Sequence, residues 1–300
     1  MRKPPHAIDI KSVFFNSQDD LRLHVRDYQP QITTHSLPVI CLPGLSRNAR
    51  DFDKLAQFLA TQELGARRVV AFDYRGRGLS AHDPNWQNYN IVTEAEDVLA
   101  GLAVLGIEHG IFVGTSRGGL ITMVLAAMRP SAIKGTVLND IGPAIDGSGL
   151  MQIRAYLTHP PKPKSWEDAI ESQKALMGKS FPAFTEDDWA HEAQCRYQSL
   201  DGVINANYDP NLAKTMKSLD AGSRLPTAWP QFGGLGKVPM LAIRGENSNI
   251  LSQKTLKQMA EMHEDMEILE IEGQGHAPAL HTADIPQKIA HFSSKIDESH

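Results

Sequence analysis

The sequence has 300 residues, of which 41% are hydrophobic, and a formal net charge of −5. This is enough for one large domain or for a core domain with an insert. Lysine and arginine are scattered without a long basic cluster, which argues against nucleic acid as a partner. The longest apolar runs are far shorter than the ~20 residues that a membrane-spanning helix needs. No apolar segment follows the basic N-terminus as it would in a secretory signal.

We therefore expect a cytoplasmic protein with a small-molecule substrate and no nucleic acid or membrane partner; the oligomeric state cannot be read from the sequence. Cys41 lies in an apolar run and Cys195 in a predicted helix, far apart in the chain. In a cytoplasmic protein these are expected to be two reduced, buried thiols rather than a disulfide. No Cys/His spacing is typical of zinc. We expect neither a metal nor a cofactor.

Strand and helix patterns alternate along most of the chain, which predicts an α/β fold with a doubly wound, mostly parallel sheet. The chain opens with a β-hairpin at residues 12–28, whose two strands flank a polar turn. In chain order, further strands are expected at 37–44, 67–74, 110–116, 132–140, 238–244 and 266–273, and helices at 51–64, 90–106, 117–128, 253–263 and from about 285.

This alternation stops between residues 144 and 232, where no convincing strand is seen. Helical patterns at 165–178, 185–200 and 210–219 are separated by proline-rich pieces, and over half of the Trp and Tyr residues lie here. An α-helical insert between two strands of one sheet is typical of a cap. We therefore assign residues 1–143 and 233–300 to the core and residues 144–232 to a helical cap.

The segment GTSRGG places Ser116 in a G-x-S-x-G pattern, directly after an apolar strand and directly before an apolar helix. Such a strand-to-helix turn strains the serine backbone and projects the hydroxyl from the sheet edge. The Arg117 N–H, at the positive end of the new helix, would then face a developing oxyanion. A tight turn with an exposed serine is the structural alternative.

Two other loops carry candidate residues for the same chemistry. GQGHAPAL supplies His276 just after the last strand, where a histidine can reach a nucleophile; His281, five residues on, is the weaker candidate. The turn after the strand at 37–44 can aim the Leu45 N–H into the site as a second oxyanion donor. DYRGRGLS lacks the spacing of a phosphate-binding loop, so we interpret residues 73–80 as a structural Asp–Arg–backbone network.

Together, LPG, DYRGRGLS, GTSRGG and GQGHAP, in this order and on these elements, resemble the α/β-hydrolase family over residues 12–298. The segments LNDIGP and RGENSNILS resemble capped bacterial members described as enol-lactonase-like or esterase-like. The resemblance implies a serine, an acid and a histidine in this chain order.

The acid of the resembled family normally follows the strand at 238–244, but Asn249 stands there. An asparagine can hold the histidine ring but cannot stabilise its positive charge, and such a replacement costs a serine protease about 10⁴ in turnover. Asp140, at the end of the neighbouring strand, is our candidate for the acid, and Glu246 is a weaker one. A weakened Ser–His–Asn site and a purely structural Asp140 are the alternatives.

We predict a serine hydrolase that cleaves an ester, thioester or lactone of a small, partly apolar substrate through an acyl-enzyme on Ser116. Trp189 and Tyr208 in the aromatic cap are our candidates for substrate contact. A C–C bond hydrolase acting on a vinylogous diketone is the enzymatic alternative. A ligand-binding relative that has lost turnover is the non-catalytic alternative.

Overall fold

The computed structural model describes residues 7–62, 65–217 and 226–299, and its centre is an eight-stranded sheet in the order β1-β2-β4-β3-β5-β6-β9-β10. β1 and β2 form the expected antiparallel hairpin, and β2 also pairs antiparallel with β4. Every other neighbouring pair is parallel. The strands are β1 (Ile8–Asn16), β2 (Arg22–Pro30), β3 (Val39–Leu42), β4 (Val69–Asp73), β5 (Gly110–Thr115), β6 (Ile133–Asn139), β9 (Met240–Gly245) and β10 (Met266–Ile271).

The central strands are short apolar runs because helices cover both of their faces. All residues of β3, β4 and β9 are buried, as expected for parallel strands between two helical layers. β1, at the edge of the sheet, is instead half exposed. The predicted mostly parallel, doubly wound sheet is confirmed.

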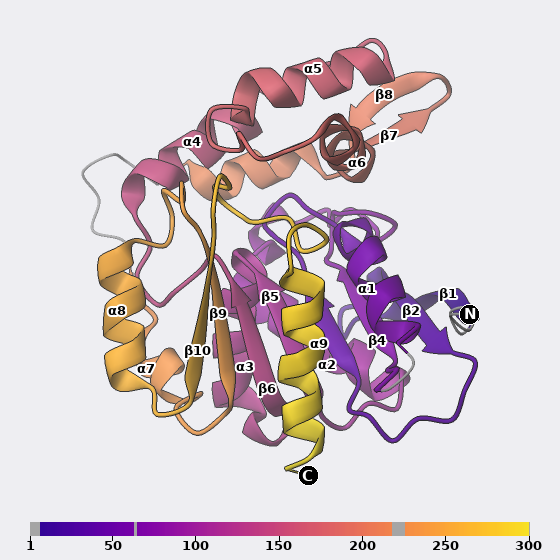
Figure 1. Ribbon diagram of the computed structural model, residues 1–300. Helices are drawn as coiled ribbons and strands as arrows, with labels where there is room; N and C mark the ends of the chain where they lie inside the picture. The colour runs from indigo at the N-terminus through magenta and orange to yellow at the C-terminus, as the bar shows by residue number, and fades with distance from the viewer. Residues whose placement is uncertain (1–6, 63–64, 218–225, 300) are drawn as a thin grey trace, which may run out of the picture.

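The two helical layers bury separate apolar clusters against the sheet (Figure 1). α1 (Asp53–Ala60) and α9 (Ile285–Asp297) pack on one face, and α2 (Ile91–Val104), α3 (Arg117–Met128) and α8 (Gln253–Met262) on the other. The side chain of Asn90 accepts hydrogen bonds from the N–H groups of Val92 and Thr93 and so caps the start of α2. Within the described part of the chain, no helix has the length and apolar character needed to cross a membrane.

Residues 144–232, which we call the insert, run between β6 and β9, two strands that are neighbours in the sheet. In Figure 1 its helices lie above the core. The insert and the core are in close contact, since a Cβ on Gly149 of the insert would lie 2.4 Å from the carbonyl oxygen of Asn249 after β9. The elements are α4 (Gly147–Thr158), α5 (Trp166–Met177), α6 (Glu186–Arg196), β7 (Tyr197–Leu200), β8 (Val203–Ala206), the 3₁₀ helix η4 (Pro210–Met216) and α7 (Trp229–Gly233).

The expectation that the insert has no strand is wrong. The predicted helix at 185–200 ends at Arg196, and β7 and β8 form a small antiparallel hairpin. Asp201 and Gly202 at its tip both have positive φ, 51° and 78°. An Asp-Gly pair in this conformation is typical of a two-residue hairpin. The apolar spacing of residues 185–200 also fits a helix, which is why the sequence predicts a helix there.

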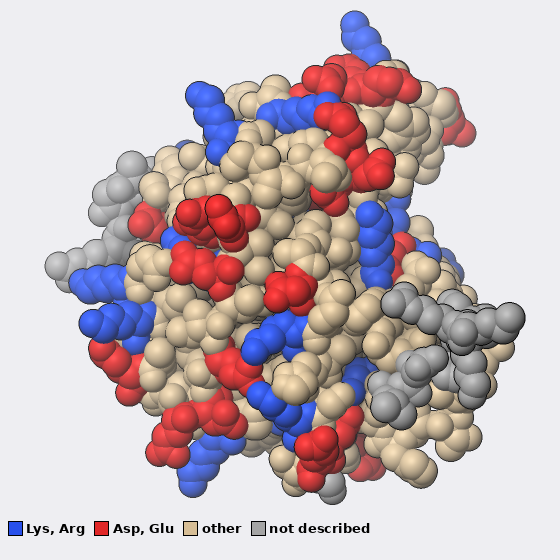
Figure 2. All heavy atoms as spheres, viewed as in Figure 1, with Lys and Arg blue, Asp and Glu red and all other residues tan. Residues whose placement is uncertain are grey.

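Surface charges of both signs are interspersed on the face that α8 and α9 present (Figure 2). Glu267 on β10, for example, pairs with Lys288 and Lys295 of α9 at 2.6 and 2.8 Å. Exposed pairs of this kind contribute about 0–1 kcal/mol each to stability. These pairs make the face hydrophilic and contribute little to the stability of the fold.

The segment after β4 forms the predicted structural network around two charged side chains. The Asp73 carboxylate accepts hydrogen bonds from the backbone N–H groups of Ala49 and Leu79 at 2.7 and 2.9 Å, and it lies 2.7 Å from His24 Nδ1. Two residues on, Arg75 is paired with Asp97, Asp83 and Asp19. This network fixes the loop at Ala49 to the end of β4.

Gly78 tests this network, because its φ is +58° and a Cβ there would lie 2.2 Å from the Asp73 carboxyl carbon. We expect Gly78→Ala to lower the free energy of unfolding by about 1–3 kcal/mol more than Gly106→Ala does, because only the first displaces hydrogen-bonded Asp73. Gly106 is the matched control, with φ +65° and no atom within 4 Å of its Cβ. Urea unfolding measures both, and equal losses would mean that the clash at Asp73 is relieved without cost.

Candidate active site

Ser116 stands at the sharp turn between β5 and α3, with φ 51° and ψ −114°. The flanking glycines are required by contact: a Cβ on Gly114 would lie 2.5 Å from the Gly119 nitrogen, and one on Gly118 would lie 2.0 Å from the Leu42 oxygen. The Ser116 N–H donates to the Asn139 carbonyl at the end of β6, at 3.0 Å. The close packing of the turn thus holds the serine in a conformation that non-glycine residues rarely adopt.

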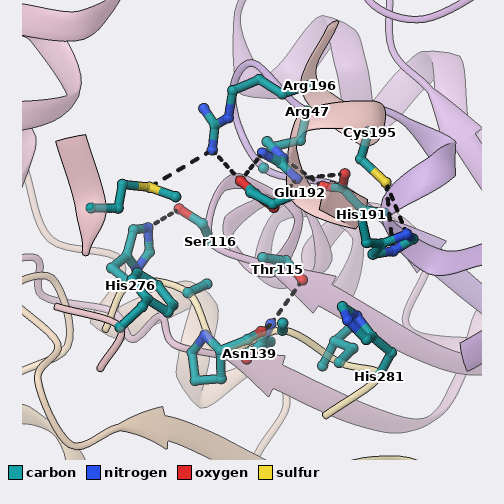
Figure 3. A pocket seen from close by; sticks show the side chains of 18 of the residues that line it. Arg47, Thr115, Ser116, Asn139, His191, Glu192, Cys195, Arg196, His276 and His281 are labelled. Atoms are coloured by element: carbon teal, nitrogen blue, oxygen red, sulfur yellow. Dashed lines mark hydrogen bonds and ion pairs between the residues drawn. The ribbon is translucent and has the colours of Figure 1, made fainter. Parts of the chain in front are cut away.

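Ser116, His276 and Asp140 form a continuous hydrogen-bonded chain. The Ser116 Oγ lies 2.9 Å from His276 Nε2, as Figure 3 shows, and His276 Nδ1 lies 2.8 Å from Asp140 Oδ2. The Asp140 side chain is fully buried and that of His276 is 12% exposed. Because an ionised carboxylate only accepts hydrogen bonds, Nδ1 carries the ring proton and Nε2 is free to accept the serine proton.

The Asp140 carboxylate is oriented by the turn that follows β9. Its Oδ1 accepts from the Gly245 N–H at 3.0 Å, and its Oδ2 accepts from the Ser248 hydroxyl at 2.6 Å. The Asp140 N–H donates to the Ile243 carbonyl of β9 at 2.8 Å. These bonds leave one lone-pair direction of Oδ2 for His276, so the ring is held at a fixed angle toward Ser116.

The other two acid candidates point elsewhere. The Asn249 Nδ2 donates to Gln152 Oε1 of α4 at 2.7 Å, so this amide binds the insert. Glu246 Oε2 accepts from the Gly273 N–H at 2.9 Å. Of the three side chains considered for contact with His276, the structure brings only Asp140 to the ring among the residues it describes. Sequence position alone could not decide this, because the choice depends on which strand end faces the histidine loop.

The two backbone groups expected to bind an oxyanion lie beside Ser116. Leu45 lines the same cavity as Ser116, and its carbonyl accepts from Arg77 Nε at 2.8 Å. A Cβ on Gly44 would lie only 3.9 Å from that of Ser116. Arg117 is the first residue of α3, so its N–H has no carbonyl partner within the helix.

The Arg117 side chain turns away from the serine and binds the buried Glu94 and the carbonyl of Tyr89. Burial disfavours the charge on Glu94, but Arg117 and Arg77 outweigh it and lower the pKa of this carboxyl. Only the backbone of Arg117 is therefore available to a substrate.

A cavity of about 140 Å³ lies between the core and the insert, with Ser116 and His276 in its wall. Part of the lining is apolar and comes from both sides: Phe52 and Leu280 of the core, and Ile153, Met177, Phe181 and Phe184 of the insert. A small, partly apolar group fits beside the serine.

Trp189 and Tyr208, the residues expected to contact substrate, do not line this cavity, so that expectation is wrong. Trp189 packs edge-to-face behind Phe181 and Phe184, at ring distances of 6.4 and 4.9 Å. Tyr208 borders a separate, much smaller cavity. Aromatic content located the right segment, but which rings face the serine depends on how the helices of the insert are rotated.

Sequence reasoning missed a charged cluster in the cavity wall (Figure 3). Glu192 of α6 binds Arg47 at 2.5 Å and Arg196 at 2.6 Å, and Arg47 also binds Asp51 at 2.7 Å. Burial opposes the charge on Glu192, but the two arginines outweigh it and lower the pKa of Glu192. The four-residue spacing of Glu192 and Arg196 on a helix was the available signal.

His281, the weaker histidine candidate, also lines the cavity, on the side away from Ser116 and His276 (Figure 3). Its Nε2 is 3.2 Å from Asp188 Oδ1, and its ring packs edge-to-face on His191 at 4.5 Å. Both partners belong to α6, so His281 connects the loop after β10 to the insert rather than bonding to Ser116.

Comparison with known proteins gives consistent matches. The family model described as alpha/beta hydrolase fold matches residues 38–280. The chain is 30% identical to a 3-hydroxybutyrate-oligomer hydrolase of Cupriavidus necator over 81% of this chain and 83% of that protein. It is 25% identical to a 2-(acetamidomethylene)succinate hydrolase of Mesorhizobium japonicum over 78% and 79%. A solved alpha/beta hydrolase from Novosphingobium aromaticivorans is 34% identical, with a TM-score of 0.88 over 96% of this chain and 99% of that one.

The buried His191 gives a testable pH dependence of stability. Burial, followed by the nearby charges of His281 and Lys54, lowers the pKa of His191 from 6.5 to about 4. Between these pH values the unfolded chain binds a proton that the folded chain does not, so stability falls as the pH decreases through this window.

We expect His191→Asn to reduce the loss of unfolding free energy between pH 7 and pH 5, measured by urea unfolding at both values. The exposed His109→Asn is the control and should leave the loss as in the unmodified protein. An unchanged loss in His191→Asn would show that this histidine is not the group responsible.

Proposed function

The chain belongs to the α/β hydrolase fold family and is a hydrolase, and from this premise we propose that it is a serine hydrolase that cleaves carboxylic esters, thioesters or lactones through an acyl-enzyme on Ser116. The observation that carries the proposal is the continuous hydrogen-bonded chain Ser116–His276–Asp140. It joins a nucleophile, a base and a carboxylate in the order that such catalysis needs.

In the proposed reaction, Ser116 Oγ attacks the carbonyl carbon while His276 Nε2 takes the hydroxyl proton. The carbonyl oxygen becomes negatively charged and is bound by the N–H groups of Leu45 and Arg117. As the intermediate collapses, the bond to the leaving group breaks and His276 returns the proton to it. Water then attacks the acyl group by the same path, releasing the acid and restoring Ser116.

Asp140 is the proposed acid because a serine hydroxyl needs a stronger base than a cysteine does. The imidazolium that forms at His276 gains its stability from a negative charge beside Nδ1, which the amide of Asn249 could not supply. The buried Asp140 also receives one hydrogen bond from the last residue of β9 and one from the turn that follows, which orient it toward His276. This arrangement supports turnover over the non-catalytic alternative.

The insert is proposed as a cap that encloses the acyl or leaving group, since Met177, Phe181 and Phe184 line the cavity that contains Ser116. Phe181 and Phe184 take the place of Trp189 and Tyr208 as the aromatic residues in contact with substrate. The relatives support hydrolysis of a small molecule, since one is named for an oligomer of 3-hydroxybutyrate and another for an acetamidomethylene derivative of succinate.

A fluorophosphonate should label Ser116 alone, because only a serine paired with a histidine base is nucleophilic enough to react. Intact-mass analysis should give one adduct for the unmodified protein and for Ser12→Ala, which changes an exposed serine on β1. The adduct should be absent in Ser116→Ala. A label that persists in Ser116→Ala would overturn the assignment of the nucleophile.

Two opposite substitutions test whether Asp140 or Asn249 is the residue that supports His276. We expect Asp140→Asn to lower kcat for a short-chain ester by about 10³–10⁴, as loss of the carboxylate does in serine proteases. Asn249→Asp should not raise kcat, because the side chain at this position binds Gln152 of α4 and does not contact His276.

An increase in kcat of an order of magnitude or more in Asn249→Asp would instead identify position 249 as the site of a weakened acid. Because Asp140 is buried, its variant is compared with the unmodified protein by circular dichroism and urea unfolding. A loss of activity counts only where both variants remain folded at the assay temperature.

A further inference from the structure

Arg196 has a guanidinium group whose hydrogen-bonding capacity is only partly used. This residue ends α6 and lines the cavity of Ser116, with a side chain that is 11% exposed. Its Nη2 donates to Glu192 Oε1 at 2.6 Å and lies 4.0 Å from the Met177 sulfur. Among the residues that the structure describes, the buried Nε has no acceptor.

Arg47, the other arginine of the cavity wall, provides the contrast. Its Nε and Nη2 bind the two oxygens of Asp51, and its Nη1 and Nη2 bind the two oxygens of Glu192. Two carboxylates therefore hold the Arg47 guanidinium by paired bonds. Arg196 binds Glu192 through one N–H only, so its guanidinium is less fully paired than that of Arg47.

Tyr156 holds the Arg196 guanidinium in addition to Glu192. The guanidinium carbon lies 5.6 Å from the centre of the Tyr156 ring, and the Tyr156 hydroxyl is 2.7 Å from Ser46 Oγ in the core. Arg196 and Tyr156 also separate the cavity of Ser116 from the smaller cavity next to it. Figure 3 shows the Arg196 guanidinium on the same side of the cavity as Glu192, with one nitrogen directed at the Glu192 carboxylate.

Arg196 lines the cavity, and its Nη1 has no hydrogen-bond partner among the described residues, so a ligand in the cavity can supply an acceptor. The planar fork of a guanidinium matches a carboxylate, which can accept two parallel hydrogen bonds from the two Nη groups. We propose that Arg196 binds a free carboxylate of the substrate, so that the preferred substrates are esters that carry a second, unesterified carboxyl group. The substrate class rests on the proposed ester hydrolysis at Ser116, whereas the carboxylate subsite can be tested without it.

The kinetic test compares monomethyl with dimethyl esters of succinate and glutarate, which differ only in whether the remote carboxylate is free. In the unmodified protein, kcat/KM for the monoesters should exceed that for the diesters by about 10- to 100-fold, the range of a charge-assisted hydrogen bond. In Arg196→Gln this preference should fall to within about 2-fold, mainly through KM, because uniform binding is lost.

Three controls separate recognition from folding. Hydrolysis of the neutral diesters should fall less in Arg196→Gln than hydrolysis of the monoesters, since Glu192 keeps its paired bonds to Arg47. Arg196→Lys should restore part of the preference, because it keeps the charge but loses the fork. Arg68→Gln, which changes an arginine that binds Asp27 outside the cavity, should leave the preference intact.

The binding test measures the binding of monomethyl glutarate by calorimetry to two proteins. One carries Ser116→Ala, and the other carries both Ser116→Ala and Arg196→Gln. Binding that depends on Arg196 supports the subsite even if no ester is cleaved, in which case the proposed hydrolysis fails alone. Diesters cleaved as fast as monoesters, with no effect of Arg196→Gln, would overturn the subsite and leave the hydrolysis standing. Inorganic phosphate that competes more tightly than glutarate would also overturn it, in favour of a phosphate site.

Discussion

The hydrogen-bonded chain Ser116–His276–Asp140 requires three distant pieces of the sequence to meet at one edge of the sheet. Ser116 follows β5 and Asp140 follows β6, and these strands are parallel neighbours, so their carboxyl ends lie side by side. His276 follows β10, which reaches the same edge through β9. A residue 160 positions from the serine therefore bonds to it without a long side chain. The parallel order of the strands is the constraint on which the site depends.

Because the carboxylate lies at the end of β6 and not in the turn after β9, the side chains of that turn make other contacts. Ser248 now supports Asp140, and Asn249 is free to bind Gln152 of α4. The backbone at Asn249 also packs so closely on Gly149 that a Cβ there would lie 2.4 Å from its carbonyl oxygen. The segment that would normally carry the acid has become a contact between the core and the insert.

Local signals in the sequence were sufficient for the sheet, the helices on its faces, Ser116 and His276. Apolar runs and their spacing depend on neighbours within a few residues, and the serine turn has its own pattern of glycines. The acid was harder, because Asp140 and Asn249 both lie at carboxyl ends of strands and only the packed turn distinguishes them. The insert was hardest, since Trp189 and Phe184 belong to the same aromatic segment and only the packing of α6 and of the turn before it decides which one faces the cavity.

The orientation of α6 is itself set by the core. The last carbonyls of a helix have no partners within it, and those at the end of α6 are bound by core side chains. The carbonyl of Cys195 accepts from Asn48 Nδ2 at 2.8 Å, and that of Tyr197 accepts from Arg50 Nη2 at 2.9 Å. Arg50 brings a positive charge to the negative end of the helix dipole.

These bonds have a consequence for the cavity, because Arg196 lies between the two carbonyls that they hold. The loop that supplies Asn48 and Arg50 also supplies Arg47, which binds Glu192 one turn earlier on α6. The N–H of Ala49 in the same loop donates to Asp73 at the end of β4. One core loop thus fixes both the backbone and the carboxylate that position Arg196. This part of the wall, although it belongs to the insert, is therefore placed relative to Ser116 by contacts with a loop of the core, and the insert acts as a fixed wall at this point.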